Sequence, residues 1–373
     1  MAKRPKVMVV MGTRPEAIKM APVLEQLAKS EVLDHCLCVT AQHRDMLDQV
    51  LEIFDITPDH DMDLMQPNQT LDQLTARVLT GLTPILKAEQ PDVVLVHGDT
   101  TTTLGGALSA FLQGIAIGHV EAGLRSYDLT QPFPEEMNRV LADRICRYHF
   151  APTSLSKEQL EREAIPSEHI VITGNTAIDA VQLALPKARG VEIEGLPDLS
   201  GRRMVLVTAH RRESFGGSFR DMCCAIRDIV EAFDDVDVVY PVHLNPNVQA
   251  PVHEILGDHP RIHLLRPLPY LPFLRLMSEA HIVLTDSGGL QEEAPSLDKP
   301  VLVMRELTER PEGVHAGVLK LVGTTREGIV AGATSLLSDD ALYADMAGRA
   351  NPYGDGHAAE RIVKYLEEDL AGD

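Results

Sequence analysis

Short apolar runs alternate with amphipathic stretches along the first half of the chain. Four runs have the length and β-branched content of buried strands, and they are residues 6–11, 35–41, 92–98 and 115–120. The stretches between them have apolar residues three or four positions apart, as helices do, and they are residues 15–29, 44–54, 70–88 and 100–113. This alternation predicts a parallel sheet with helices on both faces.

The alternation stops at residues 174–203, a charged stretch with proline and glycine and no clear period, where we place a domain boundary. A second series of apolar runs follows, at residues 204–210, 236–243, 261–265, 281–285 and 301–304. The sequence therefore predicts an α/β fold with two doubly wound, Rossmann-like domains that face each other across a cleft. Residues 1–174 and a C-terminal helix near 356–373 form the expected first domain, and residues 175–355 form the second.

Length and composition narrow the class of protein. The 373 residues are enough for two domains, and 44% hydrophobic with 24% charged residues is typical of soluble globular proteins. The formal charge of −21 argues against nucleic acid or an anionic membrane as the main partner. The five cysteines lack C-x-x-C spacing, which indicates neither a disulfide framework nor a zinc site and favours a reducing cytoplasm.

Ligands of open parallel sheets lie beyond the carboxyl ends of the strands, so polar residues just after a strand are candidates for a site. In "HIVLTDSGGLQEE", the amides of Ser287, Gly288 and Gly289 fall at a predicted helix start, where they favour an anion such as a phosphate. Glu293, one turn further on, is placed to accept from ribose hydroxyls. The alternative is that Asp286 or Ser287 caps the helix and the glutamates favour its first turn.

The segment "GTRPEAIK" after the first strand offers Arg14 and Lys19 as cations near the sheet edge, or else it is a turn and a solvated helix. No G-x-G-x-x-G follows that strand and no G-x-x-x-x-G-K-[ST] occurs, which disfavours dinucleotide and P-loop nucleotide binding. No H-E-x-x-H or similar spacing occurs, so we expect no catalytic metal.

Four further residues are candidates for proton transfer, namely Asp99, Glu121, Glu135 and His210. Three of them have a simpler alternative: Asp99 as a helix cap, Glu135 as a partner of a helix dipole, and His210 as a structural residue. Their common placement at strand ends on both sides of the predicted cleft favours a catalytic role.

Ten motifs in order along nearly the whole chain resemble the bacterial non-hydrolysing UDP-N-acetylglucosamine 2-epimerases. They include "GTRPEAIKMAP", "VHGDTTTT", "GHVEAGLRS", "PFPEEMNR", "HRRESFG", "TDSGGLQEEAPSL" and "NPYGDG". The resemblance implies a glycosyltransferase-type (GT-B-like) fold and interconversion of UDP-N-acetylglucosamine and UDP-N-acetylmannosamine without a cofactor. It also implies elimination of UDP to a 2-acetamidoglucal, followed by addition of UDP with inverted C2 configuration.

The resemblance assigns roles to single residues. The acid–base set is Asp99, Glu121 and Glu135, with His210 near the reacting sugar and phosphate. Contacts to the substrate are implied for Arg14 and Lys19 (diphosphate or sugar), Ser287, Gly288 and Gly289 (phosphate), Glu293 (ribose), Arg310 (polar groups of the nucleotide) and Phe273 (uracil).

The resemblance also implies activation by the enzyme's own substrate, bound at a second position beside the active site, as in bacterial members of that family. Gln42, Arg211 and His243 match residues of this second position. A homodimer is expected by the same resemblance. Two other enzymes are alternatives. A hydrolysing epimerase, which releases UDP, shares this scaffold, and the "DSGG" segment with its glutamates would serve a UDP-sugar glycosyltransferase equally. A non-enzymatic nucleotide-sugar sensor is a more distant alternative.

Overall fold

The structure is a computed structural model that describes residues 3–41, 44–66, 68–211 and 215–371. The chain divides into two compact units, which we describe separately. Unit 1 contains residues 1–183 and 354–373, and unit 2 contains residues 184–353. The first break falls inside helix α7 (Thr176–Ala188), and the second follows Tyr353.

Unit 1 is built on a seven-stranded sheet in the order β3-β2-β1-β4-β5-β6-β7, and all its strand pairs are parallel. Its strands are β1 (Lys6–Met11), β2 (Asp34–Val39), β3 (His60–Asp61), β4 (Val93–His97), β5 (Ala116–Val120), β6 (Tyr148–Ala151) and β7 (Ile170–Ile172). Its helices are α1 (Arg14–Lys29), α2 (Arg44–Ile53), α3 (Leu71–Glu89), α4 (Thr101–Leu112), α5 (Glu135–Ile145), α6 (Ser154–Arg162), a short 3-10 helix (Ser167–His169), most of α7, and α15 (Ala358–Ala371).

Unit 2 has a six-stranded parallel sheet in the order β10-β9-β8-β11-β12-β13. Its strands are β8 (Arg203–Thr208), β9 (Val236–Pro241), β10 (Ile262–Leu265), β11 (Ile282–Thr285), β12 (Val301–Val303) and β13 (Leu319–Leu321). Its helices are α8 (Gly217–Ala232), α9 (Pro246–Leu256), α10 (Tyr270–Glu279), α11 (Gly288–Glu293), a 3-10 helix (Ala294–Leu297), α12 (Pro311–Ala316), α13 (Arg326–Ser338) and α14 (Asp340–Ala347).

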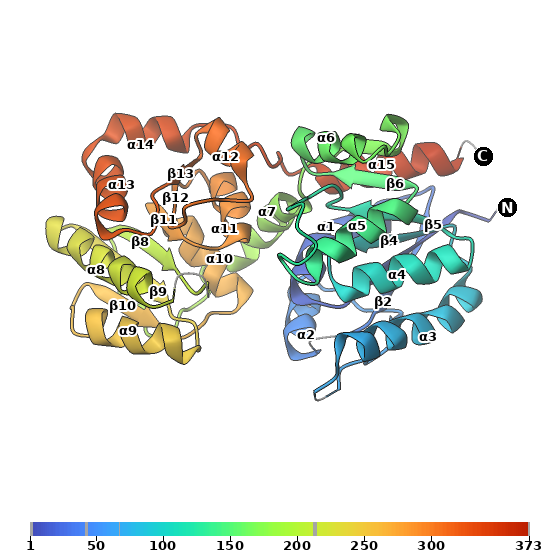
Figure 1. Ribbon diagram of the computed structural model, residues 1–373, viewed down its shortest axis with the longest axis horizontal. Coiled ribbons are helices and arrows are strands. Elements are labelled where there is room, and N and C mark those ends of the chain that lie inside the picture. The colour runs from blue at the N-terminus through green and yellow to red at the C-terminus, as the bar shows by residue number, and fades with distance from the viewer. Residues whose placement is uncertain (1–2, 42–43, 67, 212–214, 372–373) are drawn as a thin grey trace. The chain divides into compact units, whose positions relative to one another are not determined.

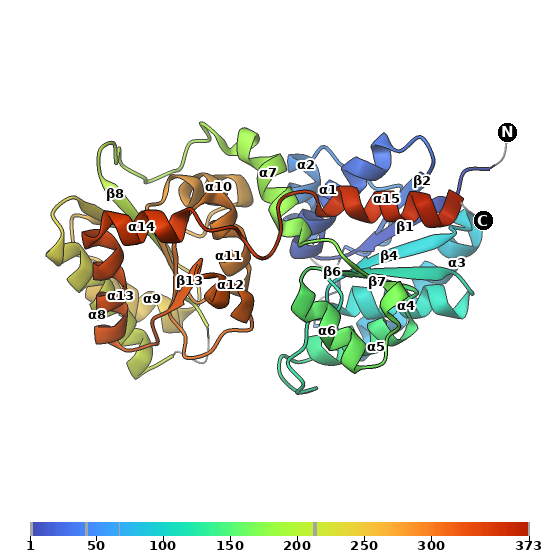
Figure 2. The ribbon, with the colours of Figure 1, turned by 90° about the horizontal axis from the view of Figure 1, so that it is seen from above.

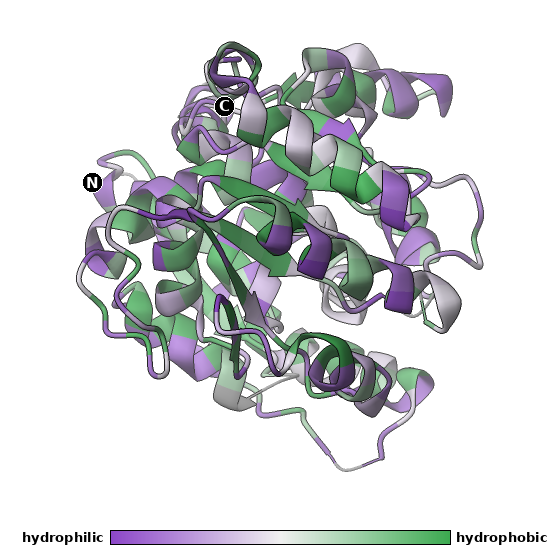
Figure 3. Ribbon diagram, turned by 90° about the vertical axis from the view of Figure 1, so that its left-hand side faces the viewer, coloured by the Kyte–Doolittle hydropathy of each residue, from purple (hydrophilic) through white to green (hydrophobic). Residues whose placement is uncertain are grey.

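The predicted parallel α/β architecture is confirmed in both units. Strands such as β4 are buried at every position, because helices cover both faces of each sheet (Figures 1 and 2). A strand that is covered on both faces must be apolar on both, and this explains the continuous apolar runs in the sequence. In Figure 3 hydrophobic colour gathers in the strands, and hydrophilic colour lies mostly on the helices and loops around them.

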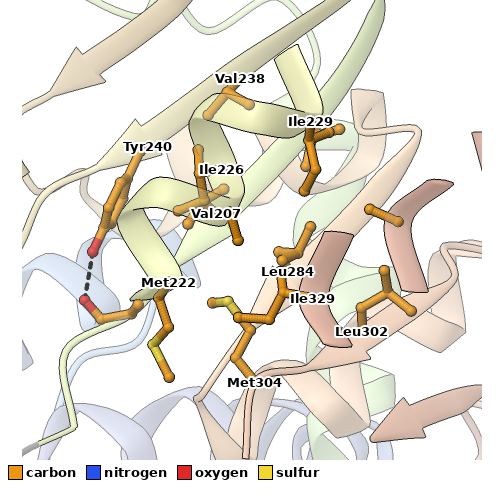
Figure 4. Packing of buried hydrophobic residues seen from close by; sticks show 14 of the residues in the cluster. Val207, Met222, Ile226, Ile229, Val238, Tyr240, Leu284, Leu302, Met304 and Ile329 are labelled. Carbon is orange, nitrogen blue, oxygen red and sulfur yellow. Dashed lines mark hydrogen bonds between the residues drawn. The ribbon is translucent and has the colours of Figure 1, made fainter. Parts of the chain in front are cut away.

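The core of unit 2 packs α8 and α13 onto its sheet. Met222 and Ile226 of α8 meet Leu284 of β11, and all three side chains are at most 1% exposed (Figure 4). Tyr240 of β9 is also buried, and its hydroxyl donates to the Ala209 carbonyl at 2.6 Å, the dashed line in Figure 4. This bond satisfies a polar group in the core and fixes the backbone just after β8.

Helix α15, at the end of the chain, belongs to unit 1 and packs against α1. Ile362 and Leu366 are fully buried in the same core as α1 and β1. At its start, the amide of Ala359 donates to Asp179 Oδ1 at 2.8 Å. Among the described residues, no helix is long and apolar enough to cross a membrane.

Candidate active site

In each sheet the strand order reverses at one point, between β1 and β4 in unit 1 and between β8 and β11 in unit 2. Adjacent loops diverge at such a point, and open α/β sheets bind their ligands there. We therefore consider the residues after β1, β4 and β5 in unit 1, and after β8 and β11 in unit 2.

Glu121 directly follows β5 and has a left-handed backbone, with φ of 67°. A non-glycine residue pays about 1–3 kcal/mol for such a conformation, so it persists where its surroundings hold it, often at functional sites. The Glu121 side chain is only 9% exposed and forms an ion pair with Lys19 of α1. His97 Nε2, at the end of β4, lies 3.5 Å from the same carboxylate oxygen.

These neighbours set the ionisation of Glu121. Burial raises the pKa of its carboxyl group, but the charge of Lys19 and the adjacent His97 outweigh burial and hold that pKa well below its usual range. Glu121 is therefore ionised at neutral pH in the ligand-free protein. The sequence placed Lys19 near the diphosphate or sugar, whereas the structure pairs it with a predicted catalytic acid.

Asp99 lies in the loop after β4, and its side chain is 30% exposed. Arg139 Nη2 of α5 donates to Asp99 Oδ2 at 2.6 Å, and Asn138 Nδ2 donates to the Asp99 carbonyl at 2.8 Å. Asp99 does not cap the following helix, because Thr100 occupies the N-cap position of α4 and accepts from the Thr103 amide. The cap reading is therefore wrong, and the carboxylate faces α5.

Glu135 and Glu136 begin α5, and the structure separates their roles. Glu136 is 1% exposed and accepts from the amides of Ser126 and Tyr127 at 3.0 and 2.9 Å, so it holds the loop before the helix. Glu135 Oε2 is buried and has no hydrogen-bond partner within the described part of the chain. A buried carboxylate oxygen of this kind is unfavourable unless a ligand or water engages it.

Glu16 is a buried acid of unit 1 that the sequence did not single out. Its Oε2 accepts from the amides of Gly12 and Thr13 at 3.0 and 2.7 Å. Its Oε1 accepts from the Thr100 hydroxyl at 2.7 Å. Glu16 thus fixes the loop after β1 to the start of α4. Arg14 lies beside it, exposed at the first position of α1.

Asp286, directly after β11, has a similar role in unit 2, because it also binds backbone amides of a loop. Its side chain is fully buried, and Oδ2 accepts from the amides of His210 and Arg211 at 2.7 and 2.8 Å. The suggestion that Asp286 caps α11 is therefore wrong, since its bonds go to the loop after β8. Ser287 occupies the N-cap position of α11 instead.

The loop after β8 brings predicted catalytic and regulatory residues together. The rings of His210 and His243 stack with centroids 5.3 Å apart and planes 11° apart. A Cβ added to Gly288 would lie 3.7 Å from Arg211 Nη2, so this guanidinium adjoins the start of α11. Gln42, the third residue of the expected regulatory position, lies outside the described residues.

The strand–turn–helix predicted for "HIVLTDSGG" is present, with Gly288 and Gly289 in the first turn of α11. A Cβ added to Gly289 would lie 3.7 Å from Glu293 Oε1, which places this carboxylate beside the helix start. Phe273 is half-buried in the first turn of α10.

Arg310 precedes α12 and forms an ion pair with the buried Glu292. The two side chains are 14% and 2% exposed. Glu292 is thus more than a partner of the helix dipole, because its pairing fixes the direction of the Arg310 guanidinium.

Comparisons with known proteins identify the family of the chain. Residues 25–367 match the sequence profile of the family described as UDP-N-acetylglucosamine 2-epimerase. The UDP-N-acetylglucosamine 2-epimerase of Escherichia coli K12 is 53% identical over 371 residues, which cover 98% of this chain and 99% of that protein. The chain belongs to the UDP-N-acetylglucosamine 2-epimerase family.

Solved structures of this epimerase family have the same fold. The enzyme from Neisseria meningitidis, solved with UDP-GlcNAc bound, is 46% identical and has a TM-score of 0.87 over 97% of this chain and 100% of that one. MurG from Acinetobacter baumannii is only 15% identical, with a TM-score of 0.59 over 98% of this chain and 99% of that one, and it supports the GT-B type of fold alone.

Three polar residues at the edge of unit 1 were not singled out from the sequence, namely Glu16, His97 and Arg139. Their motifs were noticed, but the partners that link them to other loops lie 24 to 87 positions away and depend on which strands are neighbours. Two local signals existed. Glu16 lies three residues after Thr13, as in a capping box, and Glu136 and Arg139 are three apart on a helix and therefore neighbours. In the part of the chain that the structure describes, no group of three or more His, Cys, Asp or Glu residues could hold a metal ion.

Proposed function

We propose that this protein interconverts UDP-N-acetylglucosamine and UDP-N-acetylmannosamine by epimerisation at C2, without hydrolysis. One combination supports this most: the chain is 53% identical to the E. coli epimerase over nearly its full length, and it has a buried Glu121 after β5 whose pKa is held low by Lys19 and His97. Asp99 and Glu135, the other two proposed acid–base groups, come from the loop after β4 and the start of α5.

The C2 proton of the sugar is not next to a carbonyl group, so simple deprotonation is unfavourable. We propose that a base removes this proton while the C1–O bond to UDP breaks. The electrons of the C2–H bond then form the C1=C2 double bond of a 2-acetamidoglucal, and UDP leaves with the C1–O electrons. In the second step a phosphate oxygen of UDP attacks C1, and an acid protonates C2 on the opposite face.

The three carboxylates differ in their surroundings, which suits a division of roles. A carboxylate with a strongly lowered pKa is a weak base, so Glu121 with Lys19 suits electrostatic stabilisation and orientation. Glu135, which has a buried oxygen without a hydrogen-bond partner among the described residues, is our first candidate for direct proton transfer. Asp99, paired with Arg139 and 30% exposed, is the second.

We assign UDP to unit 2. The proposed contacts are the α11 start at Ser287, Gly288 and Gly289 for phosphate, Glu293 for the ribose, Arg310 for further polar groups, and Phe273 for uracil. His210 and, in unit 1, Arg14 and Lys19 complete the proposed set around the diphosphate and sugar. Support comes from the start of α11, where backbone amides favour an anion and where the Arg211 guanidinium lies close to Gly288.

Glu293→Ala tests the ribose assignment. The variant should bind UDP about tenfold more weakly, the loss expected for a hydrogen bond to a charged group. Isothermal titration with UDP measures this, and Glu231→Ala, at an exposed acid near the end of α8 in the same unit, is the control. Unchanged UDP affinity in Glu293→Ala would remove this residue from the nucleotide site.

Proton NMR of UDP-N-acetylglucosamine incubated with the protein in D2O tests the function as a whole. Epimerisation predicts deuterium at C2 and the anomeric signal of UDP-N-acetylmannosamine. Free N-acetylmannosamine as the main product would instead identify a hydrolysing epimerase. An unchanged spectrum would favour a UDP-sugar glycosyltransferase or a sensor.

Regulation by substrate is part of the proposal. Arg211 and His243, with Gln42, form the proposed second binding position, and the stacking of His243 on His210 gives a direct contact with the proposed catalytic histidine. The rate should then depend sigmoidally on UDP-N-acetylglucosamine. A hyperbolic reverse reaction without added UDP-N-acetylglucosamine would contradict this regulation.

We also propose that the protein is cytoplasmic and forms a homodimer. The cysteines support the cytoplasmic location: those described are all free thiols, and burial raises the pKa of Cys36 and Cys38 to about 12, which keeps both as inert thiols. Light scattering of the purified protein would test the dimer directly, since a monomeric mass would contradict it.

A further inference from the structure

A cluster of buried charges lies directly behind the proton-transfer edge of unit 1, and the proposed mechanism does not use it. At its centre is His119 of β5, which is fully buried. Its Nε2 lies 2.6 Å from the Gly98 carbonyl oxygen, and its Nδ1 lies 2.5 Å from Asp143 Oδ1 of α5. Asp143 is fully buried as well.

Both partners of His119 are acceptors. A carbonyl oxygen and a carboxylate offer no proton, so an imidazolium cation, which donates from both ring nitrogens, satisfies both partners. Burial lowers the pKa of His119, but the charge and hydrogen bond of Asp143 outweigh burial and raise that pKa above its ordinary value.

The charges of the cluster are balanced. Arg125 Nη2 donates to the second oxygen of Asp143 at 2.7 Å, and Arg125 Nε donates to Glu163 Oε1 at 2.6 Å. Two cations and two carboxylates thus form one chain from β5 to the end of α6. Buried charges that are fully paired in this way are stable, whereas the loss of one member leaves an uncompensated charge.

The cluster reaches both catalytic loops. Gly98 directly precedes Asp99, and its amide donates to the Val120 carbonyl at 3.0 Å, so it bridges the ends of β4 and β5. Gly98 has a φ of 71°, which turns its carbonyl out of the strand direction toward His119. His119 is itself two residues before Glu121, so one imidazolium holds the backbone beside two proposed acids.

We propose that His119 is a positioning residue of the epimerase reaction, which holds the Gly98 carbonyl and thereby sets the relative placement of Asp99 and Glu121. The proposal rests on the proposed function. Asp143 and Arg125 keep His119 doubly protonated and correctly oriented, as a carboxylate does for a histidine in many active sites. None of these three side chains needs to touch the substrate.

Two variants separate the two bonds of His119. In His119→Gln the side-chain amide reaches the position of Nε2 and still donates to Gly98, but it loses Asp143. In His119→Asn the amide reaches the position of Nδ1 and still donates to Asp143, but it leaves the Gly98 carbonyl without a donor. His149→Gln is the matched control, because His149 pairs with His119 across β5 and β6, and a glutamine there can still donate to the Asp143 carbonyl while it loses the contact with the His169 carbonyl.

Stability and turnover should rank the variants in opposite orders. His119→Gln, which unpairs a buried charge, should have the lower melting temperature but keep most of its turnover. His119→Asn should be more stable, yet its kcat should fall about 100-fold, the loss that a catalytic group misplaced by 1 Å produces. KM for UDP-N-acetylglucosamine should stay within a factor of about three, since unit 2 is assigned the UDP, and His149→Gln should lose stability alone.

Wild-type C2 exchange is measured first, so that the two ideas fail separately. Absence of exchange in the wild-type protein would count against the proposed function. Normal exchange in the wild type together with an unimpaired His119→Asn, or turnover that simply follows melting temperature across all three variants, would overturn the positioning role.

Discussion

The two sheet edges share one topology and differ in how they use charge. In unit 1 the cations at the edge are paired with carboxylates, Lys19 with Glu121 and Arg139 with Asp99. In unit 2 a buried acid, Asp286, binds the backbone amides of the loop after β8, and the Arg211 guanidinium lies beside the start of α11. The acids after β4 and β5 thus hold cations, whereas the acid after β11 holds backbone amides. This difference agrees with our proposal of proton transfer at the edge of unit 1 and an anion at the edge of unit 2.

The largest expected effect breaks the unit 1 side of this comparison. Asp99→Asn, Glu121→Gln and Glu135→Gln should each lower kcat about 10²–10⁴-fold, the usual contribution of an acid or base. The fold should stay intact, as circular dichroism would show, and steady-state rates by NMR measure the loss. Glu158→Gln, an exposed acid on α6, is the control. Near-normal turnover would remove the tested residue from the acid–base set.

The next effect concerns the cation beside Glu121. Lys19→Met should raise the pKa of the Glu121 carboxyl, because burial then acts with less opposition. Turnover at neutral pH should fall about tenfold, and the acid limb of the profile of kcat against pH should move to higher pH. Lys29→Met, at the exposed end of the same helix, should leave both unchanged. An unmoved acid limb in Lys19→Met would mean that Glu121 does not control it.

A smaller effect compares the two loop-fixing acids directly. Glu16→Gln and Asp286→Asn should each lower the free energy of unfolding by about 1.5–3 kcal/mol, because each removes a charged acceptor of buried amides. Their functional effects should differ: Glu16→Gln should lower kcat, and Asp286→Asn should lower UDP affinity. Chemical denaturation and UDP titration measure these quantities. If both variants lose only kcat, the assignment of UDP to unit 2 is wrong.

The smallest expected effect is the pH dependence of the buried cluster. The titrating group at its centre is His119. The charged and titratable groups around His119 come from four elements or their ends, and they are Asp143, Arg125, Glu163 and His149. The raised pKa of His119 means that its contribution to stability is complete below its unfolded value of 6.5 and is lost as the pH rises through the folded value. The lowered pKa of Asp143 means that its contribution is complete above 3.8 and is lost as the pH falls.

The free energy of unfolding should therefore differ most between wild type and His119→Gln from pH 4 to 6.5. This difference, roughly 1–3 kcal/mol for a buried charge-assisted pair, should shrink at higher pH. Urea titrations at several pH values measure it. A difference that grew with pH would show that His119 is neutral in the folded protein.

Much of the fold followed from local pattern. The run at 6–11 coincides with β1, and the helical stretch at 15–29 differs from α1 by one residue. The short strands β6 (Tyr148–Ala151) and β13 (Leu319–Leu321) were missed, because three or four residues give no period to detect. Such strands form through pairing with a neighbour already in the sheet.

The candidate site was predicted in part. Strand-end position singled out Asp99, Glu121 and the α11 start, and the structure places them after β4, β5 and β11, while their roles stay predictions. The partners of these residues did not follow, since Arg139 meets Asp99 across 40 positions and Lys19 meets Glu121 across 102. Such pairs depend on strand order, which periodicity alone does not specify.

The return of α15 to unit 1 has a consequence for synthesis on the ribosome. Ile362 and Leu366 complete the core beneath α1, so the domain that starts first cannot be finished until residues 358–371 have been translated. Unit 2, a continuous insert, has all of its strands earlier and can fold first. Nascent chains should therefore expose the α1 surface for the whole translation of unit 2, which makes that surface a natural place for a chaperone to bind.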